Sequence, residues 1–165
     1  MGEQTIAAIS TALGSSGIGI VRISGERAVE VADRVFRSPS GKRLADCPSH
    51  TIHYGYIYDG DQMIDEVLAM LMRGPHSFTT EDTVEFDCHG GVYVVKRVLD
   101  AVLRNGAVPA EPGEFTKRAF LGGRIDLSQA VAVMELIQSQ NEYALAASVR
   151  QLKGNVSEKI RDLRA

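Results

Sequence analysis

The chain has 165 residues, of which 44% are hydrophobic and 24% are charged, and its net charge is −3. This length and composition are typical of about one globular domain with a short appendage, and they exclude two large domains and wholesale disorder. No apolar run is long enough to span a membrane and the N-terminus carries no signal-peptide pattern, so a cytoplasmic location is expected.

The N-terminal third predicts two strands and a helix. Short β-branched runs cover residues 5–9 and 18–23, and a Gly/Ser loop separates them. Residues 26–36 repeat apolar side chains at helical spacing, with acids in the first turns, where the helix dipole favours them. Residues 38–48 are expected to form a loop.

The middle of the chain predicts a hairpin, a third long strand and a helix. Residues 50–58 alternate in character and lead through Asp59-Gly60-Asp61 to the apolar run 67–72. After a polar loop at 74–82, residues 83–88 predict a strand with one apolar face and one acidic face, and Glu85 lies on the acidic face. His89-Gly90-Gly91 leads into a helix that ends near Asn105.

The C-terminal part is helical in pattern. One apolar stripe runs from Leu127 to Ile137, and a second predicts a single long helix to the end of the chain: Leu145, Val149, Leu152, Val156, Ile160 and Leu163. The order of elements predicts an α+β domain over residues 1–118, with a mixed sheet of about five strands and flanking helices. The start of an α-helical domain follows over residues 119–165. The basic residues from Arg150 onward fit either a nucleic-acid contact or a solvated helix face.

Several kinds of chemistry are excluded or left open by the residues. Gly41-Lys42 lacks the other residues of a phosphate-binding loop, and the two cysteines cannot form a disulfide framework or a four-cysteine metal site. We assign no metal ligand and no catalytic residue. Cys88 fits either a small buried residue or a thiol activated by the helix that follows it.

Arg22 is the most informative single residue, because it interrupts the apolar run Ile18 to Ile23. A run of this kind is expected to be covered on both faces, and a guanidinium within it needs a carboxylate or an anionic ligand. The spacing leaves two interpretations open: an internal ion pair with Glu85 or Asp87, or a ligand site.

The segment PGEFTKRAFLGGRIDLSQA, residues 112–130, closely resembles the signature of the MnmE (TrmE) family of tRNA-modification GTPases. Other motifs of the family follow the same order along the chain: TIAAIS from Thr5, GIGIVRISG from Gly17, SFTTEDTVE from Ser77, and HGG from His89. The resemblance therefore covers essentially the whole chain.

The resemblance implies an N-terminal domain similar to tetrahydrofolate-binding domains, followed by helices. A GTPase domain, with its GTP, Mg²⁺ and K⁺, would lie outside this chain. It also implies a homodimer that binds 5-formyltetrahydrofolate or methylenetetrahydrofolate. Together with the FAD-dependent partner MnmG, family members install a 5-carboxymethylaminomethyl-type or aminomethyl-type group on the wobble uridine of tRNA. The family's folate contacts fall on Arg22, Glu85 and Arg124.

Elementary chemistry gives these three residues plausible tasks. The Glu85 carboxylate can accept both hydrogen bonds from the amino group and adjacent ring N–H of a pterin. Arg22 and Arg124 can meet the pterin carbonyl or the carboxylates of the glutamate tail. The chain departs from the family pattern in the loop Ala12 to Ser16 and at Val131, where the family has a glutamate.

Two other functions remain open. The first is a dimerisation and docking scaffold that does not bind folate. The second is an autonomous folate-dependent one-carbon-transfer enzyme, for which Asp82 and Asp87 are the only acid/base candidates.

Overall fold

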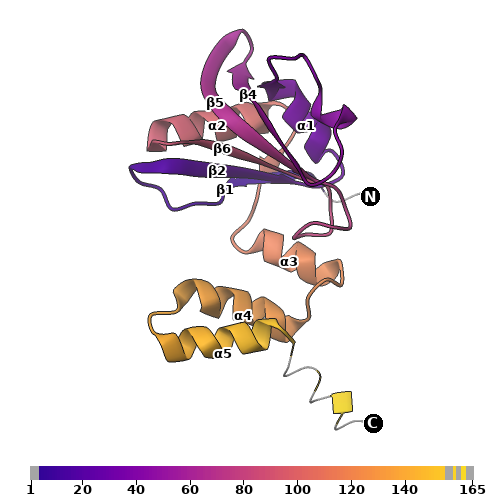
Figure 1. Ribbon diagram of the computed structural model, residues 1–165, viewed down its shortest axis with the longest axis vertical. Coiled ribbons are helices and arrows are strands. Elements are labelled where there is room, and N and C mark those ends of the chain that lie inside the picture. Colours follow the sequence, from indigo (N-terminus) through magenta and orange to yellow (C-terminus); the bar gives the residue numbers. More distant parts are fainter. Residues whose placement is uncertain (1–3, 155–157, 159–160, 163–165) are drawn as a thin grey trace. The chain divides into compact units, whose positions relative to one another are not determined.

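The computed structural model describes residues 4–154, 158 and 161–162, and the chain divides into two compact units, Met1–Pro112 and Gly113–Ala165 (Figure 1). The boundary predicted after residue 118 falls inside helix α3 (Glu114–Leu121), which belongs wholly to the second unit. Each unit has its own packing and is described by itself.

A seven-stranded mixed sheet forms the frame of the first unit, in the order β3-β4-β5-β6-β2-β1-β7. All neighbouring strands are antiparallel except β1 and β7, which are parallel. The longer strands are β1 (Ile6–Ile9), β2 (Ser16–Ser24), β4 (Thr51–Asp59), β5 (Gln62–Met72) and β6 (Thr83–Gly90).

The predicted α+β class is confirmed, but the sheet has seven strands rather than five. The two additional strands are β3 (Phe36–Arg37) and β7 (Val108–Pro109), which lie at the two edges of the sheet. Each has only two residues, so neither is long enough to produce an alternating pattern in the sequence.

Two helices, α1 (Ala28–Val35) and α2 (Val92–Arg104), cover one face of this sheet. Their valines pack against the inward side chains of the strands, including Val21, Val84 and Phe86, to form one continuous hydrophobic core. The short 3₁₀ turn η1 (Leu44–Asp46) lies within the predicted loop 38–48 and adds the fully buried Leu44. Burial of this apolar surface is the main contribution to the stability of the unit.

The opposite face of the sheet, which we call the open face, carries the alternate side chains. Ile18 of β2, Ile52 of β4 and Leu68 of β5 are 60%, 61% and 43% exposed there. The expectation that the run Ile18 to Ile23 is covered on both faces is therefore wrong. Only Val21 and Ile23 of its larger side chains lie in the core, because the helices pack on one face alone.

The second unit contains α3, α4 (Leu127–Gln138) and α5 (Glu142–Leu152). Asp126 and Gln129 form a capping box at the start of α4. The Gln129 Nε2 donates to the Leu152 carbonyl at 2.8 Å, and the Gln151 Nε2 donates to the Ser128 carbonyl at 2.9 Å. These two amides join the beginning of α4 to the end of α5.

The prediction of one long helix from Leu145 to the chain end is wrong, because α5 ends at Leu152. Gly154 follows with φ +83°, a left-handed conformation that glycine adopts easily and that commonly ends helices. Val156, Ile160 and Leu163 lie outside the described residues. Within the described part of the chain, no helix is both long and apolar enough to cross a membrane.

Candidate functional site

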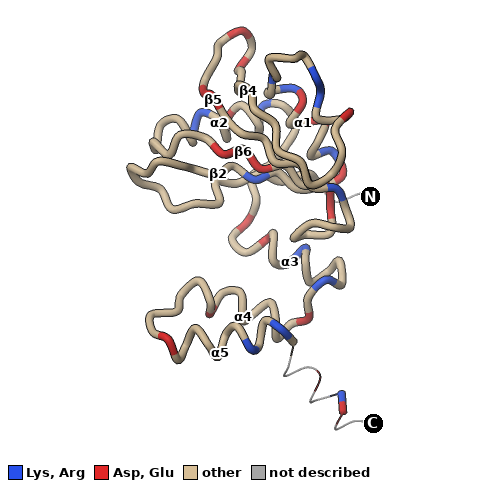
Figure 2. Tube along the Cα trace, viewed as in Figure 1, with Lys and Arg blue, Asp and Glu red and all other residues tan. Residues whose placement is uncertain are grey.

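Arg22 and Glu85 form an ion pair at the centre of the open face. The two residues lie directly opposite each other on the neighbouring strands β2 and β6, and the Arg22 Nε donates to the Glu85 Oε1 at 2.6 Å. Figure 2 shows the basic position of β2 beside the acidic positions of β6. The side chains are 26% and 13% exposed, so the pair is partly buried and still reachable from solvent. Of the two interpretations that the sequence left open for Arg22, the structure shows the internal ion pair, with Glu85 rather than Asp87 as the partner.

The loop between β5 and β6 supplies the wall beside this pair. The Ser24 hydroxyl bonds the Thr79 hydroxyl at 2.7 Å and donates to the Glu81 carboxylate at 2.6 Å. This anchoring places the Phe78 ring near Arg22, with 5.7 Å between the guanidinium carbon and the ring centroid. The motifs that begin at Gly17 and Ser77 thus meet in space, and Phe78 is a site residue that the strand and charge patterns did not reveal.

Asp87 lies two residues beyond Glu85 on the same face of β6, in very different surroundings. Its cross-strand neighbours are Ile20 on β2 and Leu68 on β5, both apolar. Its Oδ1 is buried, and no residue that the structure describes offers it a hydrogen bond. Burial, and secondarily the charge of Glu85, raises the pKa of the Asp87 carboxyl above its ordinary value.

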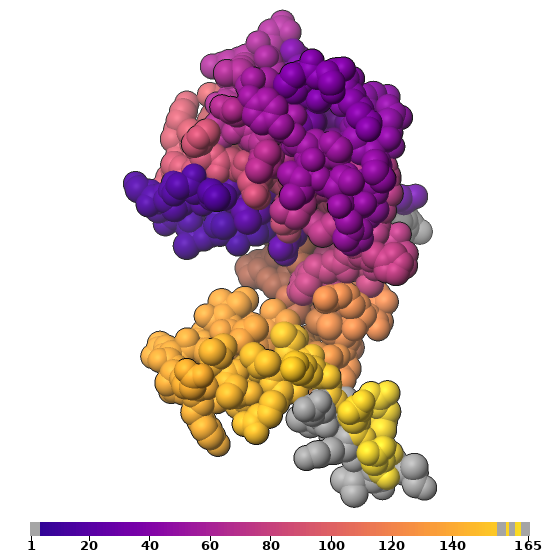
Figure 3. All heavy atoms as spheres, in the orientation of Figure 1, coloured from indigo at the N-terminus to yellow at the C-terminus, as the bar shows by residue number. Residues whose placement is uncertain are grey.

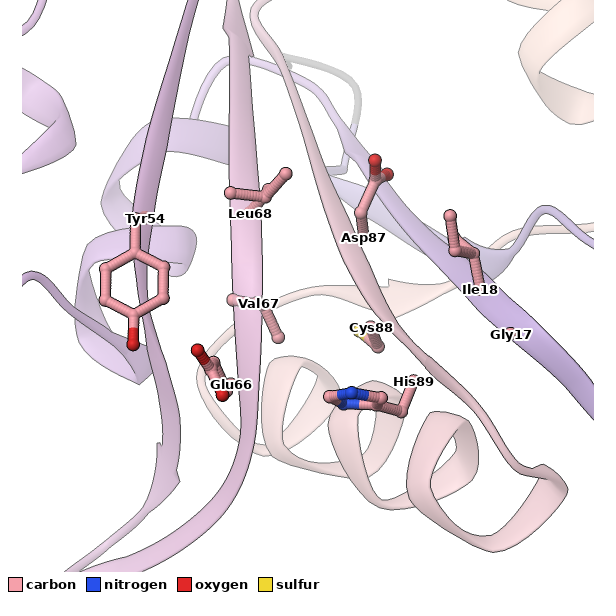
Figure 4. Close-up of a pocket in the computed structure, with 9 residues that line it drawn as sticks. All are labelled: Gly17, Ile18, Tyr54, Glu66, Val67, Leu68, Asp87, Cys88 and His89. Carbon is pink, nitrogen blue, oxygen red and sulfur yellow. The ribbon is translucent and has the colours of Figure 1, made fainter.

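A cavity of about 310 Å³ opens beside Asp87 on this face (Figure 4). Four neighbouring strands line it, and its polar side chains are those of Tyr54, Glu66, Asp87 and His89. Ile18, Val67 and Leu68 supply the apolar surface. A concave site with apolar walls and a few convergent polar groups is the usual form of a small-molecule pocket.

The polar groups at the rim of this cavity are interconnected. The His89 Nδ1 bonds the Asp65 Oδ1 at 2.7 Å, and this carboxylate raises the pKa of the imidazole. The Tyr54 hydroxyl bonds that of Tyr56 at 2.8 Å, and this bond is the main reason that the pKa of Tyr54 is raised. Only carboxylates, hydroxyls and one histidine thus offer polar atoms to the cavity lining.

Cys88 is a buried residue of the core rather than an activated thiol. It lies among the core side chains on the helix-covered face, and burial raises its pKa to about 12. A thiol with this pKa contains almost no thiolate at neutral pH. Of the two interpretations of Cys88 in the sequence, the structure supports the small buried residue.

The third predicted folate contact, Arg124, lies in the second unit and is described separately from the Arg22–Glu85 pair. It is exposed in the turn between α3 and α4, where its backbone N–H donates to the Ala119 carbonyl at 3.0 Å. In the same unit, a cavity of about 500 Å³ lies between α3 and α4, and Val131 lines it together with Met134 and Ile137. Val131 therefore extends an apolar groove where the family pattern has a charge.

The altered loop from Ala12 to Ser16 lies at the surface, within the indigo segment of Figure 3. Its ends are held by side-chain bonds: the Ile20 backbone N–H donates to the Thr11 hydroxyl at 3.1 Å, and the Ser16 hydroxyl donates to the Ile18 carbonyl at 2.8 Å. The loop thus adjoins the strand that carries Arg22.

Comparison with known families identifies the family of this chain. Residues 5–124 match the family model described as the N-terminus of the GTP-binding protein TrmE. The chain belongs to the TrmE N-terminal family. Curated relatives named tRNA modification GTPase MnmE are 58% identical in Lachnoclostridium phytofermentans, 59% in Geobacillus kaustophilus and 50% in Bacillus subtilis. The alignments cover 98–99% of this chain and 35–36% of the relatives, so the chain spans about a third of their length.

The residues at the open face of this TrmE N-terminal domain can make specific hydrogen bonds to a ligand. Glu85 can accept hydrogen bonds from paired N–H donors, and Arg22 can donate to oxygen acceptors within a planar fork. The adjacent cavity offers a flat apolar wall for a ring. The site therefore suits a planar heterocycle that carries both donors and acceptors at its edge.

Proposed function

We propose that this chain is the folate-binding and dimerising N-terminal module of a tRNA-modification GTPase. The observation that carries the proposal is the Arg22–Glu85 pair, which lies on an uncovered sheet face next to a cavity of about 310 Å³. A pterin presents an amino group and a ring N–H to one carboxylate, and a carbonyl to a guanidinium, so its edge is complementary to this pair.

The residues around the pair fit a reduced folate in two further respects. Ile18 and Leu68 offer apolar surface against which a ring can pack, and the centroid of the Phe78 ring lies 5.7 Å from the Arg22 guanidinium carbon. The acidic groups of the cavity disfavour the carboxylates of a glutamate tail, which we expect to run away from Glu66 and Asp87. Arg124 remains a proposed folate contact on the family resemblance alone.

The names of the relatives support the wider role. In the proposed role, a protein containing this chain acts in the cytoplasm with the FAD-dependent MnmG. Together they form the carboxymethylaminomethyl-type or aminomethyl-type wobble uridine of tRNA, with 5-formyltetrahydrofolate or methylenetetrahydrofolate as the bound folate. The exposed apolar side chains of the open face support a homodimer, because contiguous exposed apolar surface commonly marks an interaction site.

Calorimetric titration of 5-formyltetrahydrofolate into the purified chain tests the proposal. We expect saturable binding to the parent chain and at least tenfold weaker binding to Glu85→Gln, which is about 1.4 kcal/mol, because one oxygen acceptor becomes an N–H donor. Glu26→Gln is the matched control, since Glu26 is exposed and the substitution removes the same charge outside the site.

Two results would contradict the folate module. One is equal affinity in the parent and in Glu85→Gln. The other is the absence of binding by a parent chain that is folded and dimeric, which would favour the dimerisation scaffold instead.

A further inference from the structure

Glu85 and Asp87 share one strand face but have opposite environments. Successive residues rise about 3.3 Å along a strand, so the two carboxyls lie on the order of 7 Å apart and can contact one small ligand. Glu85 is opposite Arg22, which donates to it at 2.6 Å. Asp87 is opposite Ile20 and Leu68, whose side chains offer no hydrogen bond.

The buried oxygen of Asp87 is the anomaly that requires an explanation. A buried carboxylate oxygen normally has a hydrogen-bond partner, because leaving it without one is costly in free energy. The Asp87 Oδ1 has none among the described residues, and Asp87 lines the cavity beside the Arg22–Glu85 pair. A proton on this carboxyl would remove the unfavourable charge and create a hydrogen-bond donor beside the cavity.

The groups around Asp87 favour the same form. The charged and titratable side chains that face it come from all four strands at the cavity: Arg22 from β2, Tyr54 from β4, Glu66 from β5, and Glu85 and His89 from β6. The one guanidinium in this set is bonded to Glu85, and the one imidazole is bonded to Asp65. Two further carboxylates, Glu66 and Glu85, disfavour a negative charge on Asp87.

We propose that Asp87 is a second folate-binding carboxyl, which is protonated in the complex and donates a hydrogen bond to an acceptor atom of the pterin, while Glu85 accepts from its donor atoms. This inference rests on the proposed function. Two carboxyls whose environments differ in this way commonly take opposite proton roles at one site. Asp82, the other acid/base candidate of the sequence, has a structural task instead, because it accepts from the Gly74 backbone N–H at 2.9 Å and pairs with Arg73.

The assignment predicts that folate binding requires the protonated form of Asp87. Binding of 5-formyltetrahydrofolate is therefore expected to weaken at least tenfold between pH 5.0 and pH 8.0, since only the protonated carboxyl donates. Asp87→Asn carries a permanent donor, so we expect it to bind folate with little dependence on pH. Between pH 5.0 and pH 8.0, the fold-change in its affinity should be at least five times smaller than the fold-change of the parent. Asp61→Asn, which removes a charge in the exposed β4–β5 turn, should retain the parent's pH dependence.

His89 also titrates near this range and needs its own control. His89→Gln removes that titration, and the assignment predicts that it keeps the pH dependence of the parent. If the dependence instead disappears in His89→Gln and persists in Asp87→Asn, the histidine is responsible and the assignment of Asp87 is overturned. A parent affinity that does not change with pH also overturns it.

A measurement without ligand separates this inference from the proposed function. The ¹³C carboxyl signals of the folded chain, compared between the parent and Asp87→Asn, identify the titration of Asp87. A midpoint above that of ordinary aspartates is expected whether or not folate binds, and an ordinary midpoint would overturn the proton-holding role. A different result is a raised Asp87 midpoint in a chain that binds no folate in any variant. This result contradicts the folate proposal and overturns the role of Asp87 toward a pterin, and it leaves Asp87 as a protonated group of a different pocket.

Discussion

Arg22 has a structural task and, in the proposed function, a recognition task as well. Its Nε is held by Glu85, and its guanidinium lies near the Phe78 ring, so the side chain is fixed before any ligand arrives. A donor fork that is fixed in this way loses little conformational entropy on binding, which favours affinity and selectivity. In the proposed function, the residues that recognise the ligand are therefore the same residues that hold the centre of the sheet face.

The His89–Asp65 pair provides a residue-scale prediction about pH. The hydrogen bond to Asp65 raises the pKa of His89, so the pair contributes to stability below the ordinary histidine pKa of about 6.5 and loses that contribution as the pH rises through the raised value. We expect Asp65→Asn to lower the His89 pKa toward 6.5. An NMR titration of the His89 imidazole signals in the parent and the variant measures this, and an unchanged His89 midpoint would disprove the role of Asp65.

At the scale of elements, the packing of helix α2 against β2 depends on a glycine. On its covered face, a Cβ added at Gly19 would lie 2.4 Å from the Val95 Cγ2 of α2, closer than two carbon atoms can approach. Gly19 therefore permits the close approach of α2 to the sheet, and this packing holds the strand that carries Arg22. Gly19, the second glycine of the GIGIVRISG motif, is thus required for packing within this chain.

Gly19→Ala tests this packing. We expect the free energy of unfolding to fall by about 1–3 kcal/mol, the usual cost of overpacking a well-filled core. Gly14→Ala is the matched control, because a Cβ there would meet no atom within 4 Å. Urea denaturation of both variants measures the difference, and equal stability of the two would show that α2 moves without cost.

The whole molecule shows which features the sequence could predict. The five longer strands and the helices α1, α2 and α4 followed from hydrophobic periodicity, since each has enough residues to repeat a pattern. The edge strands β3 and β7 were too short to repeat a pattern. The apolar stripe that begins at Leu145 concealed the helix end at Gly154, because its spacing continues past the turn.

The sequence singled out two residues of the candidate site, Arg22 and Glu85, but not their pairing. The sequence indicated that Arg22 needs a carboxylate, and the choice between Glu85 and Asp87 depended on strand register, which places Glu85 opposite Arg22. The position of Phe78 depended on how the loop 74–82 packs beside β2, and the cavity depended on how β2, β4, β5 and β6 lie side by side. Local patterns do not encode these long-range arrangements.

The proposed homodimer gives a prediction for the whole molecule. If the open face is the interface, Ile52→Asp should weaken dimerisation at least tenfold, because it places an unpaired charge in a desolvated surface. Ile137→Asp is the matched control, since Ile137 is an exposed isoleucine of the second unit. Sedimentation velocity over a concentration series measures both, and a loss of dimer in the control alone would assign the interface to the helices.

The central claim is that folate binds at the open face of the sheet around Arg22 and Glu85. The most direct test is a ¹⁵N–¹H correlation spectrum of the labelled chain, recorded during a titration with 5-formyltetrahydrofolate. We predict that the largest shifts occur at the amides of β2 and β6, centred on Arg22, Glu85 and Asp87. Shifts concentrated at the groove between α3 and α4, or a spectrum that does not change at saturating folate, would contradict the claim.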